Sequence, residues 1–238
     1  MEKKKVVIFT GAGISKESGI ATFRDAVGGM WNDYKIEDVA SRDGWNRNKQ
    51  MVTDFYNQRR AQLKDVHPND AHKALAELED NYDVIVVTQN VDDLHERGGS
   101  TNIIHLHGEL KKVRCRYDNG NDYNDVQEFD GDITESDVCK CHGEMLRPHI
   151  VWFGESVDCN EAFAAFASAD IVIICGTSFN IAYTLSLVTA CENETEIHYV
   201  DPKVIKEVYH PEYFKNVTYY EEAATTGIRK VVDKLLEK

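Results

Sequence analysis

The residues best suited to chemistry follow three short apolar runs of this 238-residue chain. Gly11-Ala12-Gly13 follows the first run, and such a turn lets a backbone approach a phosphate while helix N–H groups face the anion. The full G-x-G-x-x-G pattern fails, since Lys16 holds the third glycine position. Asn90 and Asp92 follow the second run, and Gly176-Thr177-Ser178 follows the third. The pattern fits either a nucleotide-binding edge or ordinary polar turns, where Asn and Asp are common.

Two imidazoles, His105 and His107, flank a single leucine. An imidazole that is neutral near pH 7 suits a general base. If this piece is extended, the two rings point to opposite faces, so only one of them can face a pocket. From spacing alone, a core or surface histidine is the safer interpretation.

Three of the six cysteines fall in one Asp-, Asn- and Gly-rich stretch. Zinc modules often carry two C-x2-C pairs, but Cys115 stands alone because Asp118 holds its partner's position. The second half is Cys139-Lys140-Cys141, followed by His142. Three thiolates with either Asp118 or His142 could complete a tetrahedron, so we expect a structural zinc ion. The remaining cysteines look like buried structural residues: Cys159, Cys175 and Cys191.

Buried strands alternating with helices must position these residues. Continuous apolar runs of this kind predict an α/β fold with a parallel sheet covered on both faces. A helix could also start near Ser15. The runs predict strands at 4–10, 83–88, 171–175 and, more weakly, 196–200, and helices at 71–81, 160–169, 183–192 and 227–238.

Two polar stretches interrupt this alternation, and long loops inside a compact domain are usually functional or small modules of their own. We predict that 28–66 and 112–147 pack together as a small helical and zinc-binding domain. The Rossmann-like domain would then comprise 1–27, 67–111 and 148–238.

Composition limits the possible partners. The chain is 42% apolar and 29% charged, which excludes a disordered class, and its net charge of -14 argues against nucleic acid. No apolar run could span a bilayer or act as a secretory signal, so we expect a cytoplasmic protein without membrane partners. The acidic charge suits lysine-rich peptides. The sequence does not indicate an oligomeric state.

Five strings, in order along the chain, resemble the sirtuins, a family of NAD-dependent protein-lysine deacylases. The resemblance covers most of the chain. The strings are Gly11 to Arg24, Thr88 to His95, His105 to Leu110, Arg147 to Glu155, and Gly176 to Ser178.

The resemblance implies a role for each matching residue. His107 would be the base that activates a ribose hydroxyl, Asp92 would hold the nicotinamide carboxamide, and Asn90 and Gln89 would contact the ribose. Phe23 and Arg24 match the loop that closes over the cofactor. Further contacts to NAD would come from Gly11, Ala12, Gly13, Ser15, Gly176, Thr177, Ser178 and the region near Ala224.

The match is strongest to sirtuins that remove succinyl and malonyl groups. Tyr56 and Arg59 share a helix face if the segment is helical, and a phenol beside a guanidinium is a good carboxylate receptor. Without the resemblance, a solvated helix face is the better interpretation of this pair. Ala26 matches a small residue that leaves room for the longer acyl group. Val151, Phe153 and Gly154 match the segment beside which the substrate backbone adds as a strand.

The chain departs from the family at two places on the adenosine side. After Gly176-Thr177-Ser178 the family continues toward Val-x-Pro, where this chain has residues 179–183, Phe-Asn-Ile-Ala-Tyr. Tyr199 takes the place of an asparagine that touches the ribose. Two alternatives to deacylation remain. The first is an enzyme that uses NAD for ADP-ribosyl transfer or plain hydrolysis. The second is a sensor of NAD or ADP-ribose, and His107 argues against it because a sensor needs no base.

Overall fold

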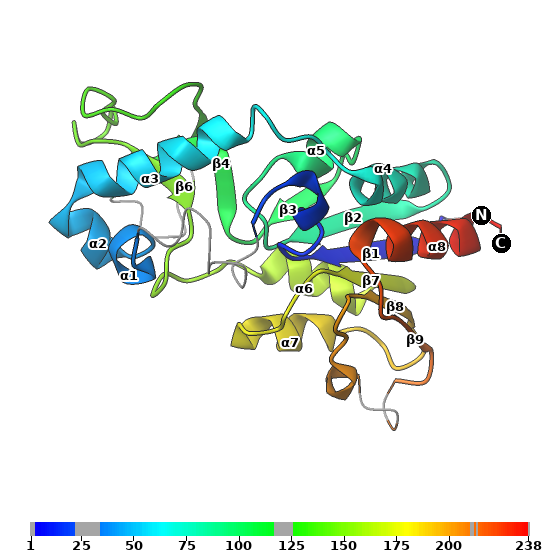
Figure 1. The fold of residues 1–238 in the computed structure, drawn as a ribbon. Coiled ribbons are helices and arrows are strands. Elements are labelled where there is room, and N and C mark those ends of the chain that lie inside the picture. The colour runs from blue at the N-terminus through cyan, green and yellow to red at the C-terminus, as the bar shows by residue number, and fades with distance from the viewer. Residues whose placement is uncertain (1–2, 22–33, 117–125, 210–211, 213, 238) are drawn as a thin grey trace.

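A six-stranded parallel sheet forms the centre of the chain in the computed structural model, which describes residues 3–21, 34–116, 126–209, 212 and 214–237 (Figure 1). The spatial order is β3-β2-β1-β7-β8-β9, and every neighbouring pair is parallel. Because the order reverses between β1 and β7, a crevice is expected at the carboxyl ends of these two strands. The strands are β1 (Lys5–Thr10), β2 (Asp83–Thr88), β3 (Ile103–His105), β7 (Ile171–Cys175), β8 (Glu196–Val200) and β9 (Val217–Tyr220).

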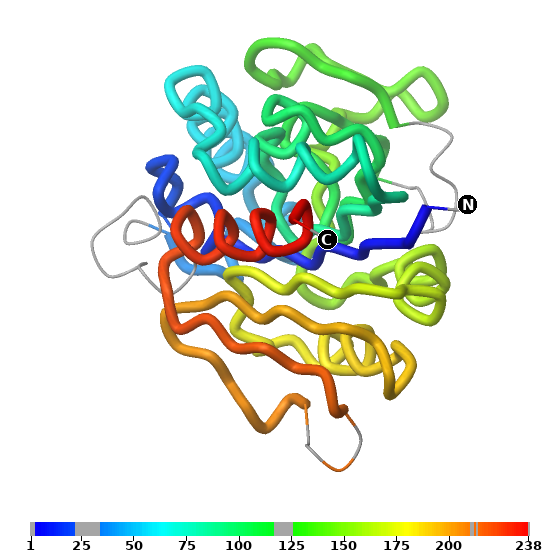
Figure 2. The backbone as a smooth tube through the Cα atoms, turned by 90° about the vertical axis from the view of Figure 1, so that its right-hand side faces the viewer, coloured from blue at the N-terminus to red at the C-terminus, as the bar shows by residue number. Residues whose placement is uncertain are grey.

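Helices cover both faces of this sheet, as its apolar strands require. Side chains alternate along β1, so Val6 and Ile8 join one hydrophobic cluster while Val7 and Phe9 join the other. Helices α4 (Asp70–Glu77) and α8 (Ala224–Leu236) cover the first face, and α6 (Asn160–Ala167) and α7 (Ala182–Val188) cover the second (Figure 1). The expected α/β class is confirmed. Figure 2 turns toward the viewer the side of the molecule on which both chain ends lie.

A smaller group of elements lies beside the sheet and has its own hydrophobic cluster (Figure 1, left). Its three-stranded antiparallel sheet has the order β5-β4-β6. Its cluster also takes in Leu94 and Trp152, from outside the stretches expected as insertions, so the domain boundaries stay a prediction. The elements are α1 (Ile36–Val39), α2 (Arg42–Arg47), α3 (Lys49–Gln62), β4 (Gly108–Arg114), β5 (Gln127–Glu128) and β6 (Arg147–Ile150).

The expected strands and helices are present, with differences in the short elements. Strands β3 and β9 were not expected, because three or four residues carry too little pattern, and the seven-residue β4 was not expected either. The helix expected to reach residue 192 ends at Val188, where Val188 and Thr189 are β-branched and poor helix formers. The helix expected near Ser15 is a single 3-10 turn. The remaining short helices are η1 (Lys16–Ser18), η3 (Leu78–Asp80), α5 (Leu94–Gly98) and η5 (Lys206–Val208).

Side-chain caps fix the helix starts that matter for the site. The Asn69 side chain accepts hydrogen bonds from Ala71 N and His72 N at the start of α4, and Asn48 accepts from Met51 N at the start of α3. Among the described residues, no helix is long and apolar enough to cross a bilayer.

Candidate active site

Polar residues gather at the carboxyl edge of the parallel sheet, on both sides of the β1–β7 reversal. They come from the turns after β1, β2, β3 and β7. Ligands of open α/β sheets bind at this place. The topology therefore brings together residues that lie up to about 165 positions apart in the sequence.

The glycines after β1 pack directly against the turn after β7. Gly11 N donates to Cys175 O at 3.0 Å, and Gly13 N donates to Gly176 O at 2.9 Å. A Cβ added to Gly13 would lie 2.5 Å from Gly176 Cα, closer than real Cβ atoms approach. Gly176 also has φ +68°, a conformation that favours glycine. The glycines therefore join two ligand-facing turns into one unit, with Ala12 half-buried at its surface.

Ser15, Asn90 and Asp92 form a buried polar network beside this unit. The Ser15 hydroxyl donates to Asp92 Oδ2 at 3.1 Å, and the Asn90 amide donates to Ser15 Oγ at 3.2 Å. Asp92 Oδ1 accepts from Leu94 N at 3.1 Å. Burial raises the pKa of Asp92, although the bonds from Leu94 and Ser15 oppose the rise. A desolvated carboxyl of this kind is a strong acceptor for an amide N–H of a ligand.

His107 is held by its Nδ1 atom, which lies 2.9 Å from the carbonyl oxygen of Gln89. A carbonyl can only accept, so Nδ1 carries the proton and Nε2 is the basic nitrogen. Burial lowers the pKa of His107, so the ring is neutral near pH 7. The hydroxyl of Tyr183 lies 2.5 Å from Nε2.

His105 has the same kind of backbone contact and a different outer partner. Its Nδ1 lies 3.1 Å from Asn90 O, and its Nε2 lies 2.7 Å from Glu96 Oε1. Burial lowers the pKa of His105, but Glu96 outweighs that effect and the net pKa is raised. Of these two rings, His107 is the one whose pKa is lowered.

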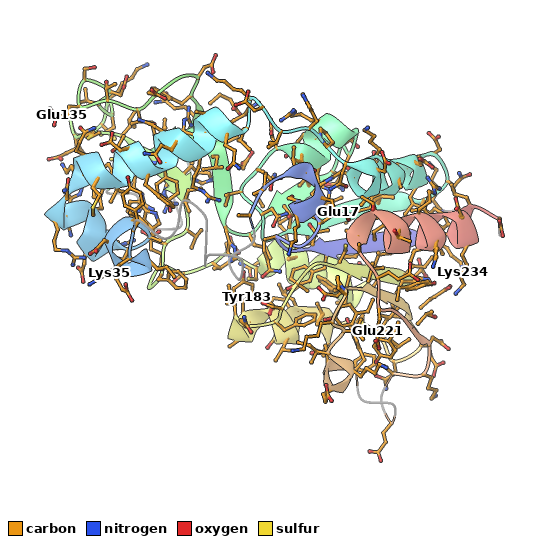
Figure 3. The ribbon with its side chains drawn as sticks, viewed as in Figure 1. Glu17, Lys35, Glu135, Tyr183, Glu221 and Lys234 are labelled. Atoms are coloured by element: carbon orange, nitrogen blue, oxygen red, sulfur yellow. The ribbon has the colours of Figure 1, made fainter. Side chains whose placement is uncertain are left out.

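The turn after β7 continues the site toward α8. The Gln89 amide donates to Thr177 Oγ1 at 2.8 Å, which ties the β2 turn to the β7 turn, and Ser178 is half-buried next to it. Ala224 is the first residue of α8, and the next residue, Thr225, is bonded through N and Oγ1 to Glu17 at 2.9 and 2.8 Å. The start of α8 is therefore fixed to η1, which carries Glu17 (Figure 3).

Tyr56 and Arg59 both lie on α3, one turn apart. The Tyr56 hydroxyl accepts from Trp152 Nε1 at 3.0 Å, and burial raises its pKa to about 12. Burial lowers the pKa of Arg59, while Tyr56 and Asp92 act in the opposite direction. Asp92 is thus one of the groups that act electrostatically on Arg59.

The segment after β6 lies next to His107. Val151 N donates to His107 O at 2.9 Å, and Phe153 N donates to Ala40 O at 3.0 Å. Phe153 is 58% exposed, and Gly154 has φ +85°. Phe153 lines an open hollow of about 530 Å³. The other residues lining the hollow are Ile36, Glu37, Ser41, Asp43 and Arg47.

A buried ion cluster that the sequence did not reveal fixes this segment. Glu155 Oε1 lies 2.6 Å from Arg147 Nη1, and Glu155 Oε2 lies 3.2 Å from Arg114 Nη2 and 2.9 Å from Trp152 N. Burial raises the pKa of Glu155, but the Arg147 guanidinium and the other donors outweigh it and lower the pKa to about 2. Arg147 also lies 3.4 Å from the Trp152 ring centre. Arg147 and Glu155 are the first and last residues of one of the five sirtuin-like strings. That string was the one sequence feature that could have indicated the cluster.

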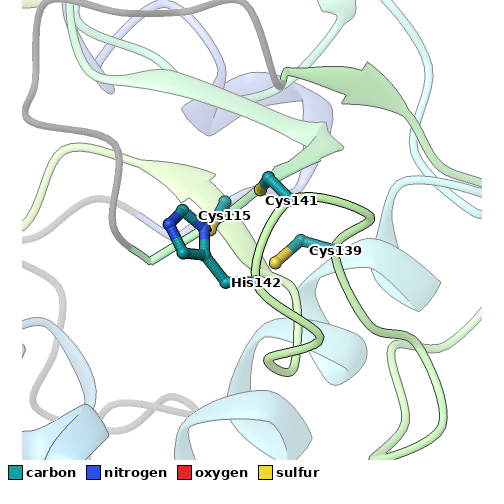
Figure 4. A group of neighbouring side chains, drawn as sticks. All are labelled: Cys115, Cys139, Cys141 and His142. Carbon is teal, nitrogen blue, oxygen red and sulfur yellow. The ribbon is translucent and has the colours of Figure 1, made fainter.

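The structure brings together Cys115, Cys139, Cys141 and His142, whose ligand atoms lie within 4.8 Å of one another (Figure 4). Cys115 Sγ is 3.4 Å from His142 Nδ1. Burial raises the pKa of Cys139, but hydrogen bonds from Cys115 and from neighbouring groups outweigh it and lower the pKa to about 7. Three thiols and an imidazole are a donor set that zinc prefers. His142, one of the two residues expected as the fourth ligand, lies next to the three thiols.

Several expected site residues lie outside the described residues: Phe23, Arg24, Ala26 and Asp118. Tyr199, expected near the ribose, is fully buried in β8, and its ring packs on Phe179 with centroids 5.7 Å apart. Its side chain is therefore part of the hydrophobic core in this structure.

Comparison with known proteins agrees with this arrangement. Residues 11–183 match the family model described as the Sir2 family. An NAD-dependent protein deacylase of Helicobacter pylori is 48% identical over 235 residues, 98% of this chain and 98% of the relative. A protein of the same name from Bacteroides thetaiotaomicron is 45% identical over 205 residues, 85% of this chain and 87% of the relative.

Solved structures give the same result. A Sir2 homologue mutant in complex with ADP-ribose has a TM-score of 0.84 and 33% identity, and the match covers 99% of this chain and 93% of that one. A Sir2 homologue in complex with NAD has a TM-score of 0.82 at 33% identity, over 99% of this chain and 91% of that one. Sheet topology, site geometry and sequence thus agree, and the chain belongs to the Sir2 family, the sirtuins.

Proposed function

We propose that this chain, an NAD-dependent protein deacylase of the Sir2 family, acts on acyl groups that carry a negative charge, succinyl and malonyl before acetyl. The products would be the free lysine, nicotinamide and O-acyl-ADP-ribose. One observation carries the acyl preference: Tyr56 and Arg59 lie one turn apart on α3. A phenol and a guanidinium one helical turn apart suit a carboxylate.

NAD has a fitting site at the sheet edge. The glycine unit formed by Gly11, Gly13 and Gly176 suits the phosphates, since its backbone is open to close approach. Gln89 and Asn90 would contact the ribose, and Asp92 would accept from the carboxamide. When bound, NAD supplies an ADP-ribosyl group to receive the acyl oxygen, with nicotinamide as the leaving group. Ala12, Ser15, Thr177, Ser178 and the start of α8 at Ala224 would complete the contacts.

His107 would be the general base. Its proton sits on Nδ1 and its pKa is lowered, so Nε2 can take a proton from a sugar hydroxyl near neutral pH. Gln89 O orients the ring. In other enzymes too, a third group commonly orients the base that activates a nucleophile.

The acyl-lysine peptide would lie beside residues 151–154. The N–H groups of Val151 and Phe153 are already bonded within the chain. An added strand would therefore pair with carbonyl oxygens of this segment and with Gly154 N–H. Glu37 and Asp43, in the hollow next to Phe153, favour basic side chains in the peptide. The six cysteines, all within the described residues, form no disulfide, which suits a reducing compartment, and we place the enzyme in the cytoplasm.

The acyl preference is tested by Arg59→Met. We expect the kcat/KM for a succinyl-lysine peptide to fall at least about 30-fold, which corresponds to losing a charged hydrogen bond, while acetyl-lysine activity stays within about threefold. Acetyl-lysine turnover by the same protein sample is the internal control. Equal loss of both activities would rule out a role in reading the carboxylate.

The reaction class is tested by mass spectrometry after incubation with NAD and a succinyl-lysine peptide. Free lysine and O-succinyl-ADP-ribose support deacylation. ADP-ribose with unchanged peptide would instead indicate NAD hydrolysis, an added ADP-ribosyl group would indicate transfer, and no turnover would indicate a sensor.

A further inference from the structure

Tyr183 contacts the proposed base, although neither the function nor the family match gives it a role. It lies in the first turn of α7, half-buried, where the family pattern has a proline (Figure 3). Its hydroxyl lies 2.5 Å from His107 Nε2, and the two rings stand edge to face at 86° with centroids 6.1 Å apart. Nε2 is the nitrogen that must meet a ribose hydroxyl.

The direction of this hydrogen bond follows from the other side of the ring. His107 Nδ1 donates to Gln89 O, so neutral His107 has only a lone pair at Nε2. The Tyr183 hydroxyl is therefore the donor. A sugar hydroxyl would approach the same lone pair as a donor, so the two groups compete for one acceptor.

Tyr183 and Phe179, from the loop before α7, belong to the same hydrophobic cluster. Phe179 is the only described non-glycine residue with a positive φ, at 52°. Its ring is buried against Phe9 and Tyr199, with centroids 6.5 and 5.7 Å apart, and this packing maintains the strained backbone. Both departures from the family pattern thus belong to one packed unit, which ends in the tyrosine on His107.

We propose that Tyr183 reversibly caps His107, occupying in the ligand-free enzyme the place that the ribose hydroxyl takes when the dinucleotide binds. The inference rests on the proposed role of His107. The cap lowers the apparent affinity for the dinucleotide, and the phenol moves aside before the base acts. Tyr183 is thus a positioning residue in the free enzyme and takes no part in the proton transfer itself.

A binding cycle with ADP-ribose, measured by calorimetry, tests the cap without turnover. Tyr183→Phe deletes the competing donor, so ADP-ribose should bind about 3- to 10-fold tighter than to the parent, the range expected for one hydrogen bond. In the His107→Ala background the same substitution should change the Kd less than about twofold, because the acceptor is gone. Tyr82→Phe is the matched control, since the Tyr82 hydroxyl bonds Leu235 O at 2.8 Å on the far side of the molecule.

Steady-state kinetics give the second readout. For Tyr183→Phe, the KM for NAD should fall by the same factor as the Kd while kcat stays within about twofold. Tyr183→Ala also removes the ring and should bind ADP-ribose at least as tightly as Tyr183→Phe. Unchanged thermal midpoints would show that both variants fold.

Four outcomes would overturn the cap. They are unchanged or weaker ADP-ribose binding by Tyr183→Phe, an equal gain in the His107→Ala background, an equal gain in Tyr82→Phe, or a fall of about tenfold or more in kcat, which would make Tyr183 a proton relay. Failure of the proposed function is recognised separately: His107→Ala would then retain deacylation, whatever the ADP-ribose cycle shows.

Discussion

The two imidazoles on either side of Leu106 show how the same residue type acquires opposite character. Each ring donates from Nδ1 to one of two successive carbonyls, Gln89 O for His107 and Asn90 O for His105. The difference lies at Nε2, where His107 meets the phenol of Tyr183 and His105 meets the carboxylate of Glu96. Burial lowers the pKa of the first, and the ion pair raises the pKa of the second. The partner of the outer nitrogen, and not the backbone contact, decides which ring can be a base.

The largest expected effect comes from replacing each of the two histidines, His107 and His105, by alanine. His107→Ala should lower kcat for deacylation by about 10²- to 10⁴-fold, since a positioned general base contributes that much. His105→Ala should stay within about tenfold, because its two ring nitrogens bond Asn90 O and Glu96 and the proposed mechanism gives it no proton to transfer. Rates measured with one succinyl-lysine peptide compare the two variants, with thermal midpoints as the folding control. Equal losses would mean that the histidines share one role.

A third imidazole, His142, extends the comparison to a ring whose partner is a thiol. We expect His142→Ala to weaken zinc binding by at least about 100-fold, because a tetrahedral site loses one ligand and loss of an outer-shell partner alone costs up to that much. His142→Cys should restore the affinity, because a thiolate is an equivalent ligand. Competition with a chromogenic chelator measures both. Parental affinity in His142→Ala would place the fourth ligand elsewhere.

The pH dependence of kcat/KM compares the two rings in one enzyme. The base must be neutral, and the pKa of His107 is lowered from about 6.5, so the acid limb should have its midpoint below that value. His105→Gln should leave the midpoint unchanged. A midpoint above pH 6.5 would contradict His107 as the titrating group. A midpoint that moves with His105→Gln would assign the acid limb to His105.

The smallest expected effect concerns the stability that His105 and Glu96 provide. The folded pKa of His105 is raised above its unfolded value, so the pair stabilises fully below about pH 6.5 and loses its effect as pH rises through the folded pKa. Glu96→Gln should therefore lower the thermal midpoint by about 1–3 °C at pH 6 and by less at pH 9. The effect is small because Glu96 is partly exposed to solvent. Calorimetric scans at both pH values measure this. A larger loss at pH 9 would contradict the raised pKa.

Local patterns in the sequence determined the class of fold and the family. Continuous apolar runs predicted the central strands, because a strand buried on both faces needs apolar residues at every position. The five strings identified a sirtuin, and they gave His107, Asn90 and Asp92 as candidates. The sequence did not predict strands β3 and β9, since short strands depend on their neighbours more than on their own residues.

Tertiary structure alone decided the environment of each group. It placed His142 beside the thiol of Cys115, buried Tyr199 against Phe179, and joined Arg114, Arg147 and Glu155 in one ion cluster. It also placed Tyr183 on His107, across 76 positions of sequence. Charge state and hydrogen-bond direction depend on burial and on which partner lies within about 3 Å, and such partners come from elements that only the folded sheet brings together.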